Sequence, residues 1–275
     1  IYPILPSVIA GIEEMDTFVK QGHVNFTDEY ALANALSKVV SATPPSVGKI
    51  EDITIDIPAI RSIIEKSPDG YIDSNTIKEL FRAAGIPQVE ELVTSDKYEA
   101  IKFASEIGFP VVAKCVGPVH KSDVGGVSLN IQSEKHLEFE FDRLIRIPET
   151  TSVMIQPMLS GQELFIGGKY EEKFGHIVLC GLGGIFVEIL KDVASGLAPL
   201  SLEEASSMIR SLRAYKIIQG ARGQKGVNEK LFTEIIVRLS IMLRNTPEIK
   251  EMDINPLLAN ESKVIAVDAR IRIEK

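Results

Sequence analysis

Apolar residues recur at every third or fourth position in several stretches of the chain, a spacing that predicts amphipathic helices. The clearest stretch begins at Ser201, which forms a capping box with Glu204, and a second covers 228–244. Two earlier stretches end at Gly85 and Gly108, and a proline follows each of these glycines by two residues. The helices expected from these patterns are 27–42, 57–66, 74–85, 96–108, 201–212 and 228–244.

Shorter runs rich in Val, Ile and Leu lie between these helices, and glycine-containing turns separate many of them, as expected for β-strands. Strands and helices mix along the chain without the strict alternation of βαβ units. This order favours an α+β fold over a doubly wound parallel sheet. The expected strands are 111–116, 127–131, 152–159, 163–170, 176–180, 252–259 and 263–273.

The chain divides into three parts by its local composition. Residues 1–45 hold an apolar start with two prolines, expected as a loop or extended segment, then one helix, and are too short to form a domain alone. Residues 46–70 mix Pro, Gly, Ser and charges, which is typical of a linker, here with one short helix. Residues 71–275 hold most of the periodic segments and form the expected main domain. The first residue is not Met, so we expect a fragment or a processed chain.

Composition and charge exclude several classes of protein. The 275 residues are 45% hydrophobic and 25% charged, which is ordinary for a globular protein. A net charge of −8 argues against a basic face for nucleic acid, but leaves room for a local phosphate pocket. No apolar run reaches about 18 residues, and the N-terminus lacks the basic start of a signal peptide, so no membrane span or leader is expected. Cys115 and Cys180 each lie in an apolar run, and we expect two core thiols in a reducing cytoplasm.

The segment HKSDVGGV carries the first candidate chemistry. Its histidine, His120, could act as a general base or as a nucleophile toward phosphorus. Lys114 and Lys121 offer positive charge, and the N–H groups of Gly125 and Gly126 can approach phosphate oxygens closely. On these residues alone, a solvent-exposed histidine in a turn is the simpler interpretation.

Two further clusters could bind phosphate or a metal ion. Gly183 and Gly184 belong to GLGG, which follows a predicted strand; this weak phosphate signal is equally compatible with a tight turn. Asp253 and Asn255 are two residues apart and would share one face of a strand, and Asp268 lies on the run that follows. Such oxygen ligands suit Mg²⁺ completed by nucleotide phosphates, whereas polar surface residues on a hairpin are the plain alternative.

Taken together, three segments resemble one known family. VVAKCVGPVHKSDVGGV, GLGGIFVEILKD, and EIKEMDINPLL with AVDARI resemble, in this order, the ATP-grasp portion of NDP-forming acyl-CoA synthetases, the group related to succinyl-CoA synthetase. The resemblance runs from about Asp73 to the C-terminus and implies an ATP-grasp fold, with two subdomains that clasp a nucleotide. Residues 1–45 resemble the last stretch of the α/β CoA-ligase domain that precedes ATP-grasp in fused members.

The resemblance also implies a mechanism, in which acyl-CoA, ADP and phosphate are interconverted with a carboxylic acid, ATP and CoA through a phosphohistidine relay. His120 matches the relay histidine, and Asp253 matches an acidic residue that could orient it or stabilise its cation. Lys114 matches the lysine that neutralises nucleotide phosphates. Asn255 and Asp268 match the Mg²⁺ ligands.

Other matches concern the nucleotide and the partners. Glu163, in GQELFIGG, matches an acidic residue near the ribose, and the hinge 156–159, including Gln156 and Met158, is expected to contact adenine through its backbone. ATP or ADP and Mg²⁺ are therefore the expected cofactors. The expected partners are CoA-binding and CoA-ligase domains, on the same or a partner chain, in a homo- or hetero-oligomer.

Two positions depart from the family pattern, and two other functions stay open. Pro157 stands where the family often has Glu, and Ser195–Gly196 stand where an aromatic–Arg pair is frequent, so contacts to the nucleotide, phosphate or acyl group differ there.

One alternative function is a non-catalytic nucleotide-sensing module of a larger fusion protein, against which the retained histidine, lysine and metal-ligand positions argue. The other is an ATP-grasp ligase that joins a carboxylate to an amine, which would not require a histidine.

Overall fold

The computed structural model describes residues 4, 12–41, 53–117, 124–184, 192–220 and 225–275. The chain divides into two compact units, Ile1–Val47 and Gly48–Lys275, and each is described by itself. Unit 1 contains α1 (Ile12–Lys20) and α2 (Glu29–Ser41), with an isolated parallel bridge between Ile4 and Phe26. α2 confirms the helix expected at 27–42, whereas α1 was not expected, because nine residues are too few for a periodic pattern to stand out.

Unit 2 contains two antiparallel sheets, of which the larger spans the middle and the end of the chain. Its strands follow the order β1-β11-β9-β6-β7-β8, and β10 also pairs with β9. The two long central strands, β6 and β9, pair over most of their length, so the C-terminal hairpin and the middle of the chain form one sheet. The strands are β1 (Gly70–Tyr71), β6 (Gln162–Glu171), β7 (Gly175–Leu182), β8 (Val193–Leu197), β9 (Ile249–Ala259), β10 (Val264–Ala266) and β11 (Ala269–Ile273).

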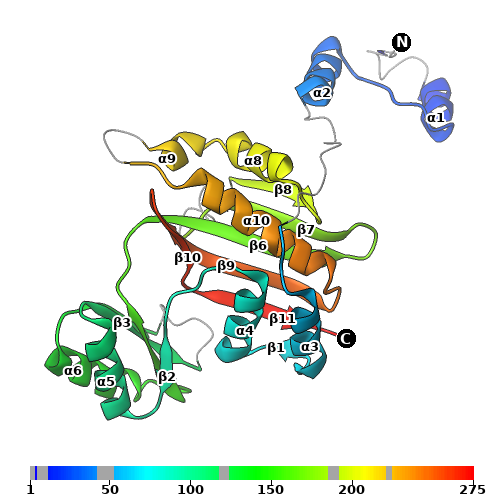
Figure 1. The fold of residues 1–275 in the computed structure, drawn as a ribbon. Coiled ribbons are helices and arrows are strands. Elements are labelled where there is room, and N and C mark those ends of the chain that lie inside the picture. The colour runs from blue at the N-terminus through cyan, green and yellow to red at the C-terminus, as the bar shows by residue number, and fades with distance from the viewer. Residues whose placement is uncertain (1–3, 5–11, 42–52, 118–123, 185–191, 221–224) are drawn as a thin grey trace. The chain divides into compact units, whose positions relative to one another are not determined.

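Three helices cover one face of this large sheet (Figure 1). They are α8 (Leu202–Ser211), α9 (Tyr215–Gln219) and α10 (Glu229–Arg244). α8 begins with the capping box of Ser201 and Glu204 that the sequence predicts. Buried side chains such as Ile209 of α8 and Phe232 of α10 join the helices to the sheet, and burial of each such side chain stabilises the fold by about 1.5–3 kcal/mol.

Two further helices, α3 (Ile57–Lys66) and α4 (Ser74–Ala84), pack on each other and belong to the same core. Ile60 and Ile64 of α3 are fully buried there. The short helix expected within 46–70 is present, and its apolar face is buried in the core of unit 2. α4 ends as predicted at Gly85, whose φ of 67° is left-handed and suits glycine.

The smaller sheet follows the order β2-β5-β3-β4, and α5 and α6 cover one of its faces. α6 was not expected, because its sequence EKHLEFEFDRL is rich in charges and buries only Leu137, Phe141 and Leu144. The elements are β2 (Leu92–Thr94), α5 (Lys97–Ile107), β3 (Val111–Val116), β4 (Val127–Ile131), α6 (Glu134–Leu144) and β5 (Ser152–Pro157). Two mainly antiparallel sheets, each with helices on one face, confirm the α+β class.

Both cysteines are buried free thiols, as the apolar runs around them predict. Cys115 is fully buried on β3, and Cys180 lies on β7 in the core of the large sheet. Burial raises the pKa of the Cys180 thiol to about 12. This thiol is therefore a packing group and not a reactive one.

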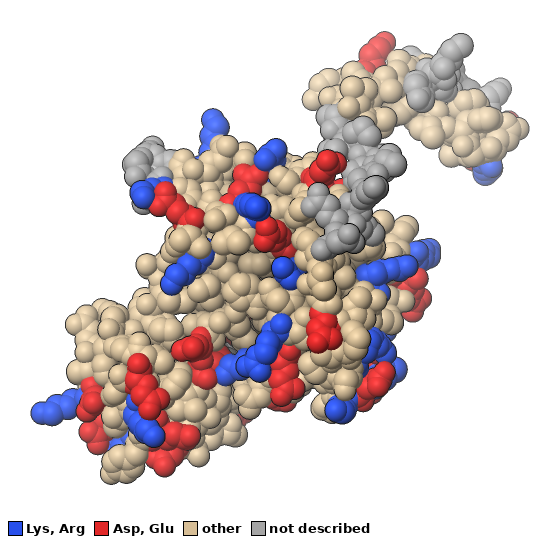
Figure 2. All heavy atoms as spheres, viewed as in Figure 1, with Lys and Arg blue, Asp and Glu red and all other residues tan. Residues whose placement is uncertain are grey.

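The surface of the described residues carries mixed charge. Figure 2 shows Lys and Arg interleaved with Asp and Glu over the visible face. In the parts of the chain that the structure describes, no helix has both the length and the apolarity needed to cross a membrane.

The N-cap of α4 provides a test of local stabilisation. The Asp73 carboxylate accepts hydrogen bonds from Asn75 N at 2.9 Å, from Thr76 N at 3.1 Å and from Thr76 Oγ1 at 2.7 Å. The two hydrogen bonds from Thr76 lower the pKa of Asp73, and the bond from the Thr76 hydroxyl has the largest effect. We expect Asp73→Ala to lower the free energy of unfolding, measured by urea denaturation, by about 1 kcal/mol at pH 7.

The loss of unfolding free energy in Asp73→Ala should become smaller as the pH falls. Because the native pKa of Asp73 is lowered, its contribution is complete above about pH 4 and is lost as the pH falls through the native value. The difference between wild type and Asp73→Ala should therefore shrink in acid. Ser133 caps α6 by accepting from His136 N at 3.3 Å, and its hydroxyl does not titrate, so Ser133→Ala is the matched control with a constant cost. A constant cost at Asp73 would contradict the charged cap.

Candidate functional site

Two of the residues that the sequence singled out lie outside the described residues. His120 and Lys121 belong to 118–123, and the stretch 185–191 that follows GLGG is also outside. Their roles stay predictions. The other residues can be placed, and they lie on the two sheets of unit 2.

The glycine turn after β7 lies against β6 and β9. Gly183 N donates to Glu163 O at 2.8 Å, and Gly184 N donates to the side-chain oxygen Oδ1 of Asn255 at 2.9 Å. A Cβ atom at Gly183 would lie 2.5 Å from Leu164 O, and one at Gly184 would overlap the Glu163 carboxylate. Gly184 also has a φ of 60°. Both positions therefore require glycine, and the turn brings together three candidate positions that are far apart in sequence.

Asn255 and Asp268 face each other across the C-terminal hairpin. Asn255 N donates to Asp268 O at 3.0 Å, and the strand register is the same on both sides of this pair. The sequence predicts one strand over 263–273, but the structure divides it into β10 and β11 on either side of Asp268. The strand is interrupted because Pro256, on the paired strand β9, has no N–H to donate to the ladder.

Asp253 lies on β9 together with Asn255, and both point away from α8 and α10. Their neighbours Met252 and Ile254 are buried in the core under these helices, so by alternation the two polar residues occupy the other face. Burial raises the pKa of Asp253, and Asp268 adds to this effect while Arg270 opposes it. A cation close to this carboxyl would favour its charged form.

Lys114 lies on the corresponding face of the small sheet. It occupies β3, opposite Met154 of β5. Ala113 is fully buried in the core under α5 and α6, and Cys115 is fully buried as well, so by alternation Lys114 points to the side that these helices do not cover. Each sheet therefore has one face packed against helices and another face that carries predicted site residues.

Gly125 and Gly126 end the segment that contains His120. Gly125 has a φ of 67°, and its carbonyl accepts from Arg143 Nη1 at 2.8 Å. The Gly126 carbonyl accepts from Cys115 N at 2.8 Å. These two bonds anchor the end of the segment to α6 and β3.

The hinge after β5 has one backbone group engaged within the protein. Met158 N donates to Pro110 O at 2.9 Å. The adenine contact expected from the hinge backbone stays a prediction, and it would use groups other than this N–H. The Gln156 side chain is only 1% exposed, and its Nε2 donates to Glu91 Oε2 at 2.7 Å and to Val267 O at 3.1 Å.

Sequence reasoning missed Glu91 and its partner Lys78. The Glu91 side chain is 2% exposed, and the Lys78 ammonium on α4 lies 3.3 Å from its Oε1. Lys78 also donates to Glu91 O at 2.9 Å. No signal in the sequence distinguishes Glu91 from the adjacent Glu90, because adjacent acidic residues are typical of a solvated surface.

The positions that depart from the family pattern lie on β5 and β8. Pro157 ends β5 opposite Val111, and nothing in the structure explains this departure. A Cβ atom at Gly196 would lie 2.8 Å from side-chain atoms of both Leu200 and Met208. A larger residue at 196 would therefore require the packing between β8 and α8 to change.

Asn255 and Asp268 fit a magnesium ion that is completed by other ligands. Amide and carboxylate oxygens are the donors that Mg²⁺ prefers. Across the described ranges, no three His, Cys, Asp or Glu side chains converge on one point. A cation held by this pair would take its remaining ligands from water and phosphate oxygens, which is the usual mode of Mg²⁺.

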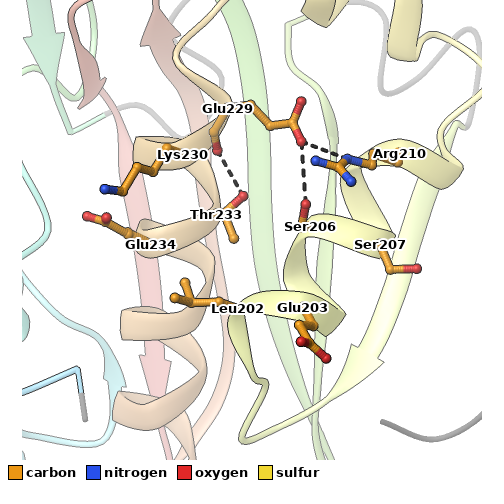
Figure 3. Close-up of a pocket in the computed structure, with 9 residues that line it drawn as sticks. All are labelled: Leu202, Glu203, Ser206, Ser207, Arg210, Glu229, Lys230, Thr233 and Glu234. Atoms are coloured by element: carbon orange, nitrogen blue, oxygen red, sulfur yellow. Dashed lines mark hydrogen bonds and ion pairs between the residues drawn. The ribbon is translucent and has the colours of Figure 1, made fainter. Parts of the chain in front are cut away.

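A separate groove of about 660 Å³ lies between α8 and α10 (Figure 3). Glu229 accepts from Arg210 Nε at 2.9 Å and from Ser206 Oγ at 3.4 Å, while Thr233 Oγ1 donates to Glu229 O at 2.8 Å. These groups satisfy one another and join the two helices. None of the site residues expected from the sequence lines this groove, so we assign it to helix packing.

Comparison with known proteins gives matches over most of unit 2. The profile of the ATP-grasp domain family matches residues 64–273. The β subunit of ADP-forming acetate–CoA ligase I from Pyrococcus furiosus is 43% identical over 223 residues, which are 77% of this chain and 96% of the subunit. ADP-forming acetate–CoA ligase II from Archaeoglobus fulgidus is 41% identical over 197 residues, which are 70% of this chain but 29% of that protein. The chain therefore spans nearly all of one relative and under a third of the other.

Solved structures of one similar protein, the dinucleotide forming acetyl-coenzyme A synthetase 1 of Ca. Korarchaeum cryptofilum, match as well. In a complex with coenzyme A, Ca-AMPCP and HgCl+, the TM-score is 0.72 at 36% identity, over 78% of this chain and 98% of that chain. A second structure of that protein is a complex with coenzyme A and Mg-AMPPCP, in which its phosphohistidine segment points towards the nucleotide binding site. It matches with a TM-score of 0.68 at 35% identity, over 80% of this chain and 100% of that chain.

Proposed function

As this chain belongs to the ATP-grasp family of ADP-forming acyl-CoA synthetases, we propose that it transfers a phosphoryl group between a nucleotide and His120. The proposed overall reaction interconverts acyl-CoA, ADP and phosphate with a carboxylic acid, ATP and CoA. CoA-binding and CoA-ligase domains, on the same or a partner chain, would supply the other half of this reaction. Residues 1–45 are proposed as the end of such a CoA-ligase domain, with the ATP-grasp domain following the linker.

The observation that carries the proposal is the hydrogen bond between Gly184 N and Asn255 Oδ1 at 2.9 Å. It joins the predicted phosphate turn to the predicted metal-ligand pair, although 71 residues separate the two positions. Glu163 lies against the same turn. A phosphate-binding turn and Mg²⁺ ligands are expected to be adjacent in a nucleotide site, because the metal would neutralise charge on the same phosphates.

Each candidate residue would have its own role in binding the nucleotide and the metal ion. Lys114 would neutralise phosphate charge from the small sheet, and Glu163 would bind the ribose. Asn255 and Asp268 would hold Mg²⁺, which supplies charge neutralisation at the phosphates. The N–H groups of the Gly183–Gly184 turn donate to Glu163 O and Asn255 Oδ1, so the turn would hold β6 and the Asn255 side chain in place beside the phosphates.

His120 would perform the covalent step. Its neutral imidazole nitrogen attacks the γ-phosphorus of ATP, the bond from phosphorus to the bridging oxygen breaks, and ADP leaves. In the other direction the phosphoryl group returns to ADP. Asp253 would orient the imidazole or stabilise its cation.

Phosphoenzyme formation tests this proposal. After incubation with Mg²⁺ and ATP labelled at the γ-phosphate, the wild-type chain is expected to carry an acid-labile, base-stable label, detected by gel autoradiography. His120→Ala should carry none, because the accepting nitrogen is gone. His136 is exposed on α6, and His136→Ala should be labelled like the wild type.

The other outcomes separate the alternatives. Equal labelling of His120→Ala would overturn the relay role. A wild-type chain that binds ATP but takes no label would favour a nucleotide-sensing module or an ATP-grasp ligase that makes no phosphohistidine.

A further inference from the structure

We propose that Gln156 and Glu91 are positioning residues that hold the loop 266–269, which contains Asp268, in register with the small sheet that carries Lys114. The inference rests on the proposed function, because it gives Asp268 the role of a metal ligand. It assigns Gln156 a role through its side chain that differs from the expected backbone contact with adenine. It also gives a role to Glu91, a buried carboxylate that the proposed mechanism does not use.

The contacts of Gln156 connect the two sheets. Gln156 lies on β5 of the small sheet, and its Nε2 donates at 3.1 Å to the carbonyl of Val267, which lies between β10 and β11 of the large sheet. The same Nε2 donates to Glu91 Oε2 at 2.7 Å. The next residue after Val267 is Asp268, whose carbonyl accepts from Asn255 N at 3.0 Å. One side-chain amide is therefore one residue from the predicted metal ligands.

Glu91 fixes the direction of this amide. Its carboxylate is 2% exposed and is held in place by the Lys78 ammonium at 3.3 Å. Both partners of Gln156, the Glu91 carboxylate and the Val267 carbonyl, are acceptors, so the amide must present its NH₂ group to both. The Gln156 Oε1 atom is buried and has no hydrogen-bond partner among the described residues. The reversed amide would place Oε1 against both acceptors, so the orientation with Nε2 toward them is favoured although Oε1 is left without a partner.

The hydrogen-bond network of Gln156 and Glu91 connects to α4 through Lys78 at one end and to Asn255 at the other. Lys78 belongs to α4, which packs against the core of the large sheet, and it also donates to Glu91 O at 2.9 Å. Asn255 Oδ1, at the other end, accepts from Gly184 N at 2.9 Å. A buried charge that is paired and hydrogen-bonded has few alternative arrangements, since each unpaired alternative carries a large desolvation cost. The network can thus set the position of the metal-ligand pair relative to β5, and so relative to Lys114 on β3, which pairs with β5.

Replacement of Gln156 by methionine tests the proposal. Methionine keeps the volume and adds no charge but cannot donate, so both bonds are lost while Glu91 keeps Lys78. In the absence of metal and nucleotide, amide hydrogen exchange at 266–269 should become about 5-fold faster, since one anchor of the loop is gone. The gain in ADP affinity on addition of Mg²⁺, measured by calorimetry, should fall by about 10–100-fold, as for other residues that orient metal ligands. ADP affinity without Mg²⁺ should change by less than about 2-fold.

An exchange of the two side chains gives a second, independent measurement. Gln156→Glu alone places two carboxylates together and should lower both stability and the Mg²⁺-dependent gain. In the double variant Glu91→Gln/Gln156→Glu, a donor again faces an acceptor between the two positions, so stability should recover in part. The carboxylate introduced at position 156 would still present an oxygen to the Val267 carbonyl, so the Mg²⁺-dependent gain should not recover. Gln132→Glu, in an exposed loop before α6, is the control and should behave like the wild type.

Any other result of these measurements would contradict either the positioning role of Gln156 or the proposed function. Equal losses of ADP affinity with and without Mg²⁺ in Gln156→Met would overturn the positioning role and indicate a direct nucleotide contact. An unchanged Mg²⁺-dependent gain, or unchanged exchange at 266–269, would overturn it too. If the wild-type chain binds no ADP under any condition, the proposed function itself fails, and the inference fails with it.

Discussion

Replacement of Asp268 by alanine is expected to lower the affinity of the chain for ADP in the presence of Mg²⁺ by about 100-fold or more. Residues that only orient a metal ligand already contribute about 10–100-fold to metal affinity, and a direct carboxylate ligand contributes at least as much. Asp268 lies opposite Asn255, so the variant would leave a single amide oxygen for the ion. Calorimetric titration with ADP, with and without Mg²⁺, measures the effect.

The loss should be confined to the metal-dependent part of binding. Without Mg²⁺, Asp268→Ala should bind ADP as well as the wild type or slightly better, since one negative charge near the phosphates is removed. Asp268→Asn keeps an oxygen without the charge and should fall between the two. Asp16, an exposed aspartate of α1, provides the matched control Asp16→Ala. If Asp268→Ala keeps the full Mg²⁺ dependence, Asp268 is not a metal ligand.

Replacement of Phe232 by alanine is expected to lower the free energy of unfolding of unit 2 by about 3–5 kcal/mol. Phe232 is fully buried on α10, in the core between this helix and the large sheet. The variant loses the transfer free energy of the ring and leaves a cavity that the surrounding side chains fill only in part. The change is a large fraction of the net stability of an ordinary domain, which is about 5–15 kcal/mol.

Urea denaturation followed by circular dichroism measures this change. Phe139 lies on α6 with 68% of its surface exposed, so Phe139→Ala is the matched control, with an expected change within about 0.5 kcal/mol. A loss of less than about 1 kcal/mol at Phe232, which is below the range for buried aromatic residues, would contradict the packing of α10 on the sheet.

The local elements could be predicted because their signals lie within a few residues of each other. The 3.6-residue period, the Ser201–Glu204 box and the glycine at position 85 predicted α8, α4 and their ends. α6 was missed because only three of its eleven residues are buried, and its many charges mask the period. The break between β10 and β11 was missed because it depends on Pro256 of the neighbouring strand.

The sequence predicts the candidate site as a set of residues but not as an arrangement. The motifs around Lys114, Gly183 and Asn255 indicated the chemistry, because lysine, glycine turns and paired oxygen ligands have few other uses in this order. The sequence could not indicate that Gly184 N donates to Asn255, since this contact needs β6 between β7 and β9. Nor could it indicate that Met158 N is already engaged by Pro110.

By itself, the sequence determined many of the helices and strands, the α+β class and the family to which the chain belongs, because these follow from local periodicity and from the order of motifs. Only the tertiary structure decided which groups are buried and which meet. Glu91 and Glu90 are equivalent in the sequence, yet Glu91 is enclosed with Lys78 and Gln156. The physical reason is that burial and pairing of charges depend on contacts between residues far apart in the chain, and these form only when both sheets and their helices pack.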